Sequence, residues 1–110
     1  MIKNISLLKK LPGQTHEEFA AYWTGPHAAL DKQMPRLKKY VINVLDTEQM
    51  AALGGTAIFD GVGELWWDSL EDMQADFASA EGKAAGADGV NLCEVCLNLY
   101  VKECIMVDKM

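Results

Sequence analysis

The stretch from Gly61 to Trp67, GVGELWW, carries apolar side chains on both faces of the β-strand that it predicts. Successive side chains of a strand point to opposite faces, so Val62 and Trp66 lie on one side, and Leu65 and Trp67 lie on the other. A strand with helices on one face only normally alternates apolar with polar residues. We therefore expect the second face to be covered as well, and a symmetric homodimer through the sheets is the economical explanation.

The segments around this strand predict an α+β fold of the ferredoxin-like type. Hydrophobic periodicity and turn and capping residues indicate strands at 2–11, 37–46, 61–67 and 93–104, a short helical turn at 48–53, and helices after Thr15, Ser69 and Ser79. The order βαββαβ gives a four-stranded antiparallel sheet with helices on one face. The chain of 110 residues has the length for one hydrophobic core, so we expect a single domain spanning 1–110.

Composition excludes several classes of partner. The formal net charge of −6, from 10 Lys and Arg against 16 Asp and Glu, disfavours nucleic acid, because most of the surface would repel a polyanion. No segment approaches the roughly 20 consecutive apolar residues that a membrane span requires, and the N-terminus lacks the apolar core of a signal sequence. We therefore expect a cytoplasmic protein with no membrane partner.

The cysteines do not indicate a metal or redox site. Their odd number is unsuited to a disulfide framework and favours a reducing compartment. Cys93 and Cys96 lie in a predicted strand, where positions separated by three residues point to opposite faces. No second CxxC pair or suitably spaced histidine completes a zinc site. We expect structural cysteines and no bound metal.

The first helix is interrupted by the segment Gly25-Pro26-His27. Pro26 has no amide hydrogen to donate to the Tyr22 carbonyl and disfavours helical geometry at the preceding residue, so the helix should kink or restart there. On a helical wheel, His27 falls at the border of the buried face, one turn beyond Trp23. It is either a structural histidine that bonds a strand carbonyl or a participant in acid–base chemistry.

Glu64 is the one charged residue of the apolar strand at 61–67. An unpaired buried carboxylate is costly, so Glu64 needs a partner or a wet edge. One interpretation pairs it with His27, because a strand carboxylate near a helix histidine forms an acid–base pair. The other interpretation pairs it with Lys38 or Lys39 across the sheet.

The pattern of the chain resembles the EthD family. The family reads roughly F-x-x-Y-W-x-x-x-H-a-x-L in its first helix, then P-x-L-x-x-Y-V, and later D-G-x-x-E-L-x-F-x-S before a helix and an S-x-E-G-x-x-A segment. The matching positions in the first half are Phe19, Tyr22, Trp23, His27, Ala28, Leu30, Pro35, Leu37, Tyr40 and Val41. The second half matches through DGVGELWWDSLEDMQADFASAEGKAA, in which Trp67 stands where many relatives have Phe. The likeness spans nearly the whole chain, apart from 47–57 and the tail after Val101.

This resemblance implies a dimeric α/β barrel, in which two ferredoxin-like subunits join their sheets and each keeps a pocket between helices and sheet. Relatives include methylmuconolactone methylisomerase, muconolactone isomerases, polyketide cyclases, dehydratases, decarboxylases and monooxygenases, so the fold leaves the reaction open. In methylisomerase-like and cyclase-like relatives, a histidine and a phenol or carboxylate move protons on an oxygenated ring or a β-dicarbonyl chain. The match therefore points to His27 as a general acid or base.

The leading hypothesis is a cofactor-independent isomerase, cyclase or lyase that acts on a small lactone, aromatic or polyketide-like substrate. His27 would take a proton from the carbon next to a carbonyl group. A second group would orient His27 or donate to the developing enolate; the candidates are Glu64, Tyr22 and Tyr40. The substrate would be positioned and shielded from water by Phe19, Trp23 and Trp66.

Two other classes of function stay open. The chain could be a small-molecule binding or accessory protein of a degradation pathway, with the same pocket but no proton transfer. It could also be a monooxygenase, either cofactor-free or using haem ligated by His27.

Overall fold

Four antiparallel strands form one sheet in the order β2-β3-β1-β4. They are β1 (Ile2–Lys10), β2 (Lys39–Val44), β3 (Gly61–Trp67) and β4 (Cys93–Val101). The structure is a computed structural model that describes residues 1–110. The central strands β3 and β1 are also the most buried, as expected for strands with neighbours on both sides. The ferredoxin-like α+β arrangement predicted from the sequence is confirmed.

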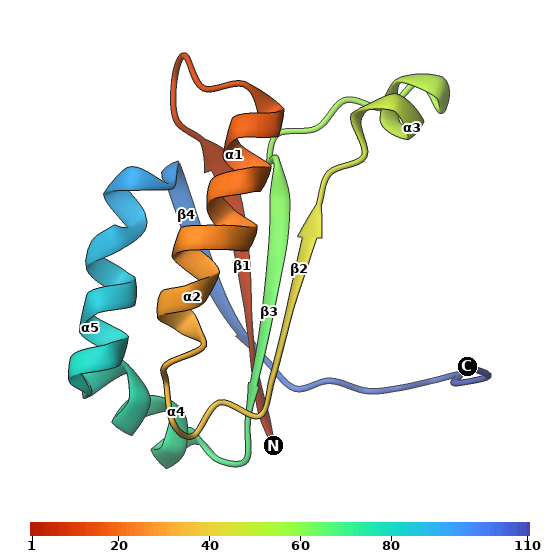
Figure 1. The fold of residues 1–110 in the computed structure, drawn as a ribbon. Coiled ribbons are helices and arrows are strands. Elements are labelled where there is room, and N and C mark those ends of the chain that lie inside the picture. The colour runs from red at the N-terminus through yellow and green to blue at the C-terminus, as the bar shows by residue number, and fades with distance from the viewer.

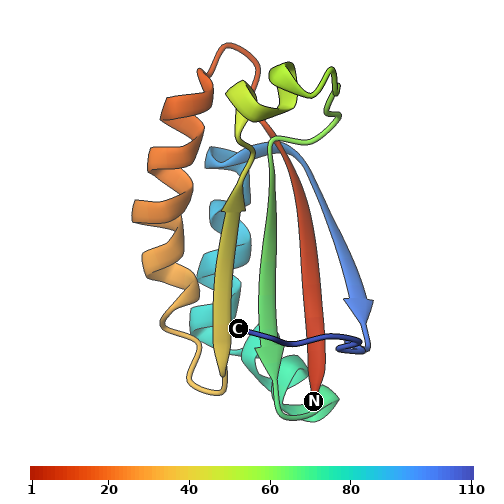
Figure 2. The same ribbon diagram turned by 90° about the vertical axis from the view of Figure 1, so that its right-hand side faces the viewer.

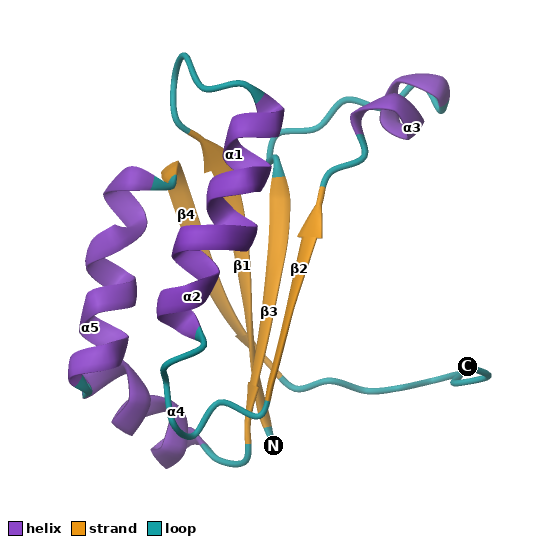
Figure 3. Ribbon diagram, viewed as in Figure 1, coloured by secondary structure: helices purple, strands orange, loops and turns teal.

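The helices cover one face of this sheet (Figure 1). The first helical segment runs through α1 (His16–Tyr22), the π-helical turn η1 (Trp23–His27) and α2 (Ala28–Asp31). The second comprises α4 (Leu70–Ala78), α5 (Ala80–Ala87) and the 3-10 turn η2 (Asp88–Asn91). A short helix, α3 (Thr47–Ala52), stands apart from both segments (Figure 3). None of these helices combines the length and the apolar character needed to cross a bilayer.

The sequence predicted a kink or a restart of the first helix at Pro26. The helix does not restart there but continues through a π-helical turn. Its start is fixed by a capping box, in which Thr15 and Glu18 exchange side-chain and backbone hydrogen bonds. At the interruption, the amide of Ala28 donates to the carbonyls of both Gly25 and Trp23. The wider turn accommodates a proline that lacks a donor, so the amide of Ala28 is not left free.

The hydrophobic core between sheet and helices is divided into two clusters. One contains Leu8, Phe19, Trp23 and Leu92. The other contains Met34, Leu65, Trp67 and Met73. Leu8 of β1 belongs to the first cluster, and Ile2 packs against the second. Between them, the same face of β1 carries two polar residues, Asn4 and Ser6. The division leaves room for a cavity in the middle of the layer.

The opposite face of the sheet carries no helix (Figure 2). The register of the strands places Ile5, Leu7, Val62, Leu97 and Leu99 on this open face. Leu97 is 48% exposed and Leu99 is 49% exposed, which is unusual for large apolar side chains on a sheet. Trp66 also lies on this face, beneath the ammonium groups of Lys3 and Lys39, 4.5 and 4.8 Å from its ring centre. β3 therefore carries apolar side chains on both faces of the sheet, as the sequence predicted.

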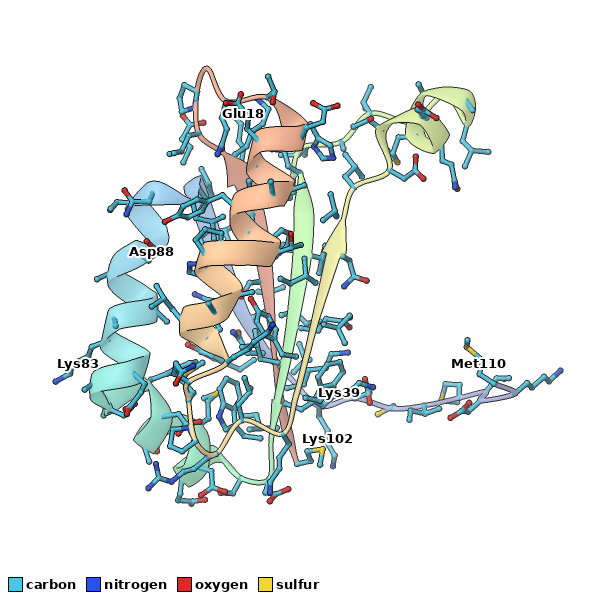
Figure 4. All side chains as sticks on the ribbon, viewed as in Figure 1. Glu18, Lys39, Lys83, Asp88, Lys102 and Met110 are labelled. Carbon is cyan, nitrogen blue, oxygen red and sulfur yellow. The ribbon has the colours of Figure 1, made fainter.

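The last strand is shorter than predicted. β4 ends at Val101 rather than at residue 104, and the following tail runs away from the sheet to Met110 (Figure 4). The ion pair between Lys3 and Glu103, with Nζ 2.8 Å from Oε2, holds the start of the tail near β1.

Candidate functional site

His27 lies between two aspartates. Its Nδ1 is 2.9 Å from Oδ2 of Asp88, and its Nε2 is 3.3 Å from Oδ2 of Asp31. Asp31 is one helical turn further along the same segment, whereas Asp88 begins η2, where α5 ends beside the first helix (Figure 4). The His27 side chain is 11% exposed, and both carboxylates are similarly buried. This histidine therefore bonds side chains, and not the strand carbonyl that the structural interpretation expected.

A tyrosine holds each of these aspartates. The hydroxyl of Tyr22 donates to Oδ1 of Asp88 over 2.8 Å. The hydroxyl of Tyr40 donates to Oδ2 of Asp31 over 2.7 Å. The result is a continuous chain of five side chains, with His27 at its centre and a phenol at each end. Buried networks of this kind fix the orientation of their members.

The two carboxylates favour the protonated form of His27. Burial alone lowers the pKa of this ring, but the hydrogen bonds and charges of Asp31 and Asp88 outweigh burial and raise it above its ordinary value. Because both ring nitrogens face carboxylates, both are hydrogen donors in the imidazolium form. The resting site therefore favours an imidazolium between two carboxylates.

The pKa values of the groups around His27 shift in the directions expected from their contacts. Burial raises the pKa of Asp88, but hydrogen bonds from Asn91, His27 and Tyr22 outweigh burial and lower it below its usual range. Burial together with the charge and the bond of Asp31 raises the pKa of Tyr40. The tyrosines of the network are therefore neutral donors at physiological pH.

A cavity of about 560 Å³ opens beside this network, between the two core clusters. His27 and Asp31 line it from the first helix, and α5 contributes small residues such as Ala85 and Gly86. On the sheet side the lining includes Asn4, Ser6, Cys96, Asn98 and Tyr100. This volume lies in the range of sites that enclose one small organic molecule.

Glu64 does not meet His27, so that predicted pair is wrong. Glu64 pairs with Ile5 and Val41 on the open face, on the side of the sheet away from the helices. Its carboxylate lies 2.7 Å from Nζ of Lys3 and accepts a 3.0 Å bond from the Asn43 amide, contacts that hold its pKa below its usual range. The alternative pairing across the sheet is right in kind, although the lysine is Lys3 and not Lys38 or Lys39. Strand alternation decides the matter, because even-numbered residues of β3 face away from the cavity.

None of the three aromatic residues predicted to contact the substrate lines the cavity. Trp66 lies on the open face with Glu64. Phe19 and Trp23 are 0% and 2% exposed and belong to a core cluster, where the Trp23 ring packs on the backbone of β3 at Gly61 and Gly63. The prediction that these aromatic residues form the wall of the pocket was wrong. Around Phe19 and Trp23, the buried face of the first helix packs directly on the sheet and leaves no cavity.

The two cysteines of the CEVC segment share one face, contrary to the prediction. The register of β1 and β4 shifts between Lys9 and Lys10, so Cys96 pairs with Leu8 and Cys93 pairs with Lys10. A β-bulge adds one residue, which reverses the expected alternation. A hydrogen bond with Cys93 lowers the pKa of Cys96, and Cys96 borders the cavity.

Two site residues were absent from the sequence analysis, namely Asp31 and Asp88. Asp31 is four residues after His27, and such pairs are neighbours on a helix, so this spacing could have indicated it. Asp88 is 61 positions from His27, and no local signal in the sequence connects the two.

The family of the chain is shown by a match over most of its length. A family model described as the EthD domain matches residues 11–94, which include the first helix, β3 and the start of β4. The chain belongs to the EthD family. No curated protein sequence matches this EthD-family chain significantly.

Solved structures share the fold of this EthD-family chain. An EthD family protein from Bacillus halodurans is 23% identical, with a TM-score of 0.79 over 94% of this chain and 99% of that one. A hydroxynitrile lyase from Passiflora edulis is 17% identical, with a TM-score of 0.69 over 94% and 95% of the two chains. A mutant of the cofactor-independent oxygenase SnoaB from Streptomyces nogalater is 8% identical, with a TM-score of 0.70 over 98% and 97%. Identities this low show a common fold, and this fold hosts more than one chemistry.

Proposed function

We propose that this EthD-family protein is a cofactor-independent enzyme of the isomerase, cyclase or lyase type, which moves protons on a small oxygenated ring, lactone or polyketide-like substrate. The observation that carries the proposal is the placement of His27 at the wall of a substrate-sized cavity, between two carboxylates. A histidine whose pKa is raised by such neighbours is suited to donate a proton near neutral pH.

We assign His27 the role of proton donor, in place of the proton removal expected from the sequence. The support is that both ring nitrogens face carboxylates, which favours the protonated ring. Oδ1 of Asp31 has no hydrogen-bond partner, because Tyr40 and His27 both contact Oδ2. In the proposed step, Asp31 takes a proton from the carbon next to a carbonyl group, and the electron pair of the C–H bond forms the enol double bond. The π pair of the carbonyl group moves to its oxygen, which takes the Nε2 proton of His27. Asp31 then delivers its proton to the carbon at the far end of the conjugated enol. The enol O–H bond returns its proton to Nε2 as the carbonyl group reforms, so the C=C bond has moved into conjugation.

Tyr22, Tyr40 and Asp88 are positioning residues in this proposal. Asp88 holds Nδ1 of His27, so that Nε2 is the nitrogen presented to the cavity. The 3.3 Å separation between Nε2 and Asp31 is longer than the contact at Nδ1, so a substrate oxygen competes more easily at Nε2. Tyr22 and Tyr40 orient the carboxylates.

The test uses α-angelica lactone, a small ring that isomerises to its conjugated form by a proton shift, together with other enolisable lactones and β-diketones. Isomerisation is followed by ultraviolet absorbance, and deuterium incorporation from D₂O by NMR. We expect acceleration by the wild type, and a loss of about 10² to 10⁴ in rate in the H27Q variant, as for a missing proton-transfer group. H16Q is the matched control, because His16 bonds the Leu45 carbonyl and does not line the cavity.

The alternative binding function predicts a different result. A protein without proton transfer would bind such probes in the cavity, and no probe would exchange faster than in buffer. That outcome, with correctly folded wild-type protein, would reject the enzymatic proposal. Oxygen uptake during turnover would favour the monooxygenase class.

The proposal includes a homodimer through the open faces of the sheets. Its support is the row of exposed leucines on β4, because burying such a row is the usual way in which a soluble sheet protein covers a second face. The L97E variant is expected to sediment as a monomer, whereas L53E, at an exposed position on the α3 connection, should leave the dimer intact. A wild-type monomer at micromolar concentration would reject this part of the proposal.

A further inference from the structure

We propose that the side-chain amide of Asn98 is the oxygen-binding donor of the cavity, held in place by Ser6 and Asn4. It would bind a carbonyl or hydroxyl oxygen of the ligand from the sheet side, opposite His27. This inference names the polar group of the substrate and rests on the proposed function for its chemical meaning.

The three residues lie together because of the strand register. Ser6 pairs with Asn98 and Asn4 pairs with Tyr100, and all of these positions face the helices. Oγ of Ser6 donates to Oδ1 of Asn98 over 2.9 Å. The Asn4 amide lies 3.4 Å from Oγ of Ser6 and 3.3 Å from Oδ1 of Asn98. Two donors therefore converge on the carbonyl end of the Asn98 side chain.

The opposite end of the Asn98 side chain is available. Its carbonyl oxygen is engaged by Ser6 and Asn4, so the geometry directs the Nδ2 amide away from them, and no protein group accepts from Nδ2. Hydrogen bonds in a chain polarise one another, so donation to Oδ1 strengthens the free N–H groups as donors. The residue borders the cavity and can present these donors to a ligand oxygen.

A second, independent observation concerns Asn4. This side chain is 3% exposed, and its Oδ1 is buried without any hydrogen-bond partner. Buried amide oxygens are almost always paired, because an unpaired one loses its bonds to water without replacement. The unpaired oxygen is enclosed by the protein, so the part of Asn4 in the proposal is to hold Ser6 and Asn98 through its amide end.

The position of this polar group argues against a purely packing role. β1 presents Leu8 to one core cluster, and Ile2 packs against the other, whereas Asn4 and Ser6 stand between them at the cavity. Apolar residues at these positions would close the gap between the clusters. The chain instead keeps three polar side chains on the face of the sheet that is otherwise used for the core.

Together, the two sides of the cavity define a ligand class. The helix side offers a proton donor and a carboxylate, and the sheet side offers the amide donors of Asn98. A ring with two oxygens satisfies both sides. The reacting carbonyl oxygen meets Nε2 of His27, and a second carbonyl or hydroxyl oxygen meets Asn98 at the floor.

The experiment compares two probes that differ in one heavy atom. They are cyclohexanone and methylenecyclohexane, in which a CH₂ group replaces the carbonyl oxygen. Binding is measured by NMR titration of the whole protein, and the side-chain NH₂ signals of Asn98 are followed directly. We expect cyclohexanone to shift these signals, and N98A to weaken its binding about tenfold, the effect of losing one good hydrogen bond. Methylenecyclohexane should bind N98A and the wild type equally well.

Two further variants complete the design. S6A breaks the chain at its centre and should weaken cyclohexanone binding less than N98A does. K102A shortens an exposed side chain just beyond the end of the same strand and should leave both probes unaffected. If N98A weakens both probes equally, or if cyclohexanone leaves the Asn98 signals unmoved, the proposal is overturned.

The outcome is separable from that of the proposed function. H27Q should retain the response of Asn98 to cyclohexanone, because binding at the floor requires no proton transfer. Oxygen-selective binding without any catalysed exchange would reject the enzymatic proposal and keep this one. Catalysed exchange that is unaffected in N98A would keep the enzyme and reject the floor site.

Discussion

Nδ1 of His27 lies 2.9 Å from Oδ2 of Asp88, although 61 positions separate the two residues. One end of this contact is set by a π-helical turn at a proline, and the other by the end of the second helical segment. The contact engages Nδ1 of the ring, while Nε2 faces Asp31. Much of the expected behaviour of the site depends on it.

Replacing Asp88 is expected to lower the pKa of His27. In D88N the ring loses one hydrogen-bonded carboxylate, so burial, which already opposes the charged form, gains in relative weight. NMR titration of the His27 ring protons measures the change. D108N, in the exposed tail, is the matched control and should leave the titration as in the wild type. A His27 pKa that is unchanged in D88N would contradict the contact.

The same pair predicts a pH dependence of stability. The pKa of His27 is raised in the folded state above the value of about 6.5 that applies to the unfolded chain. Its contribution is therefore fully present below about pH 6.5 and is lost as the pH rises through the folded value. Urea denaturation across this range should show a loss of stability in the wild type that H27Q lacks.

A control removes Cys96, a second group of the cavity with a shifted pKa. A hydrogen bond with Cys93 lowers the pKa of Cys96, so its contribution to stability changes with the opposite sign and is lost as the pH falls. Both proteins are therefore compared in a C96S background. Parallel stability curves for the two would contradict the raised pKa of His27.

Gly61 is expected to be required for the packing of Trp23. A Cβ atom at this position would overlap the indole ring of Trp23, whereas a Cβ at Gly63 would lie 3.3 Å from it. Trp23 is 2% exposed and has little space to move, so G61A should lower the free energy of unfolding by about 1 to 3 kcal/mol. Urea denaturation measures the difference. G63A should cost less.

A helical glycine with open space gives the comparison for that experiment. A Cβ at Gly86 would meet nothing within 4 Å, and alanine is the better helix former. G86A should therefore match or exceed the wild type in stability. Equal destabilisation of G61A and G86A would mean that the contact with Trp23 is not responsible.

Cys96 is expected to be the most reactive thiol at neutral pH. Its bond with Cys93 lowers its pKa, so a larger fraction is thiolate, the reactive form, than in an ordinary cysteine. Brief treatment with N-ethylmaleimide at about pH 7, followed by peptide mass spectrometry, should label Cys96 before Cys104, an exposed thiol of the tail. Replacing the bonding partner in C93A should slow the labelling of Cys96. Faster labelling of Cys104 than of Cys96 would count against the bond.

Local patterns were enough to predict the architecture. Capping residues, turn residues and hydrophobic periodicity act over a few positions, and they placed the ends of β3 and the start of α1 correctly. The two-sided apolar character of Gly61–Trp67 also belongs to the sequence alone, because strand alternation requires it. These features depend on neighbours along the chain.

The sequence did not predict the site correctly where the outcome depends on which face of the sheet a residue occupies, or on contacts between distant segments. One of the two interpretations of Glu64 paired it with His27 as an acid–base pair, yet its even-numbered position in β3 places it on the open face. Cys93 and Cys96 were separated by a parity argument that a single β-bulge reverses. A shift of one residue in register is invisible to composition, but it moves a side chain to the other side of the sheet.

The order of residues along the chain was sufficient to place His27 after a helix interruption, at the edge of a buried face, in an EthD-type ferredoxin-like fold. What His27 meets depends on the folded arrangement: Asp88 from a distant part of the chain, Asp31 with its tyrosine, and a cavity with a polar floor on β1 and β4. The physical reason is that helix and strand formation depends on residues close in sequence. The protonation of a side chain depends instead on charges and burial that distant segments bring to it.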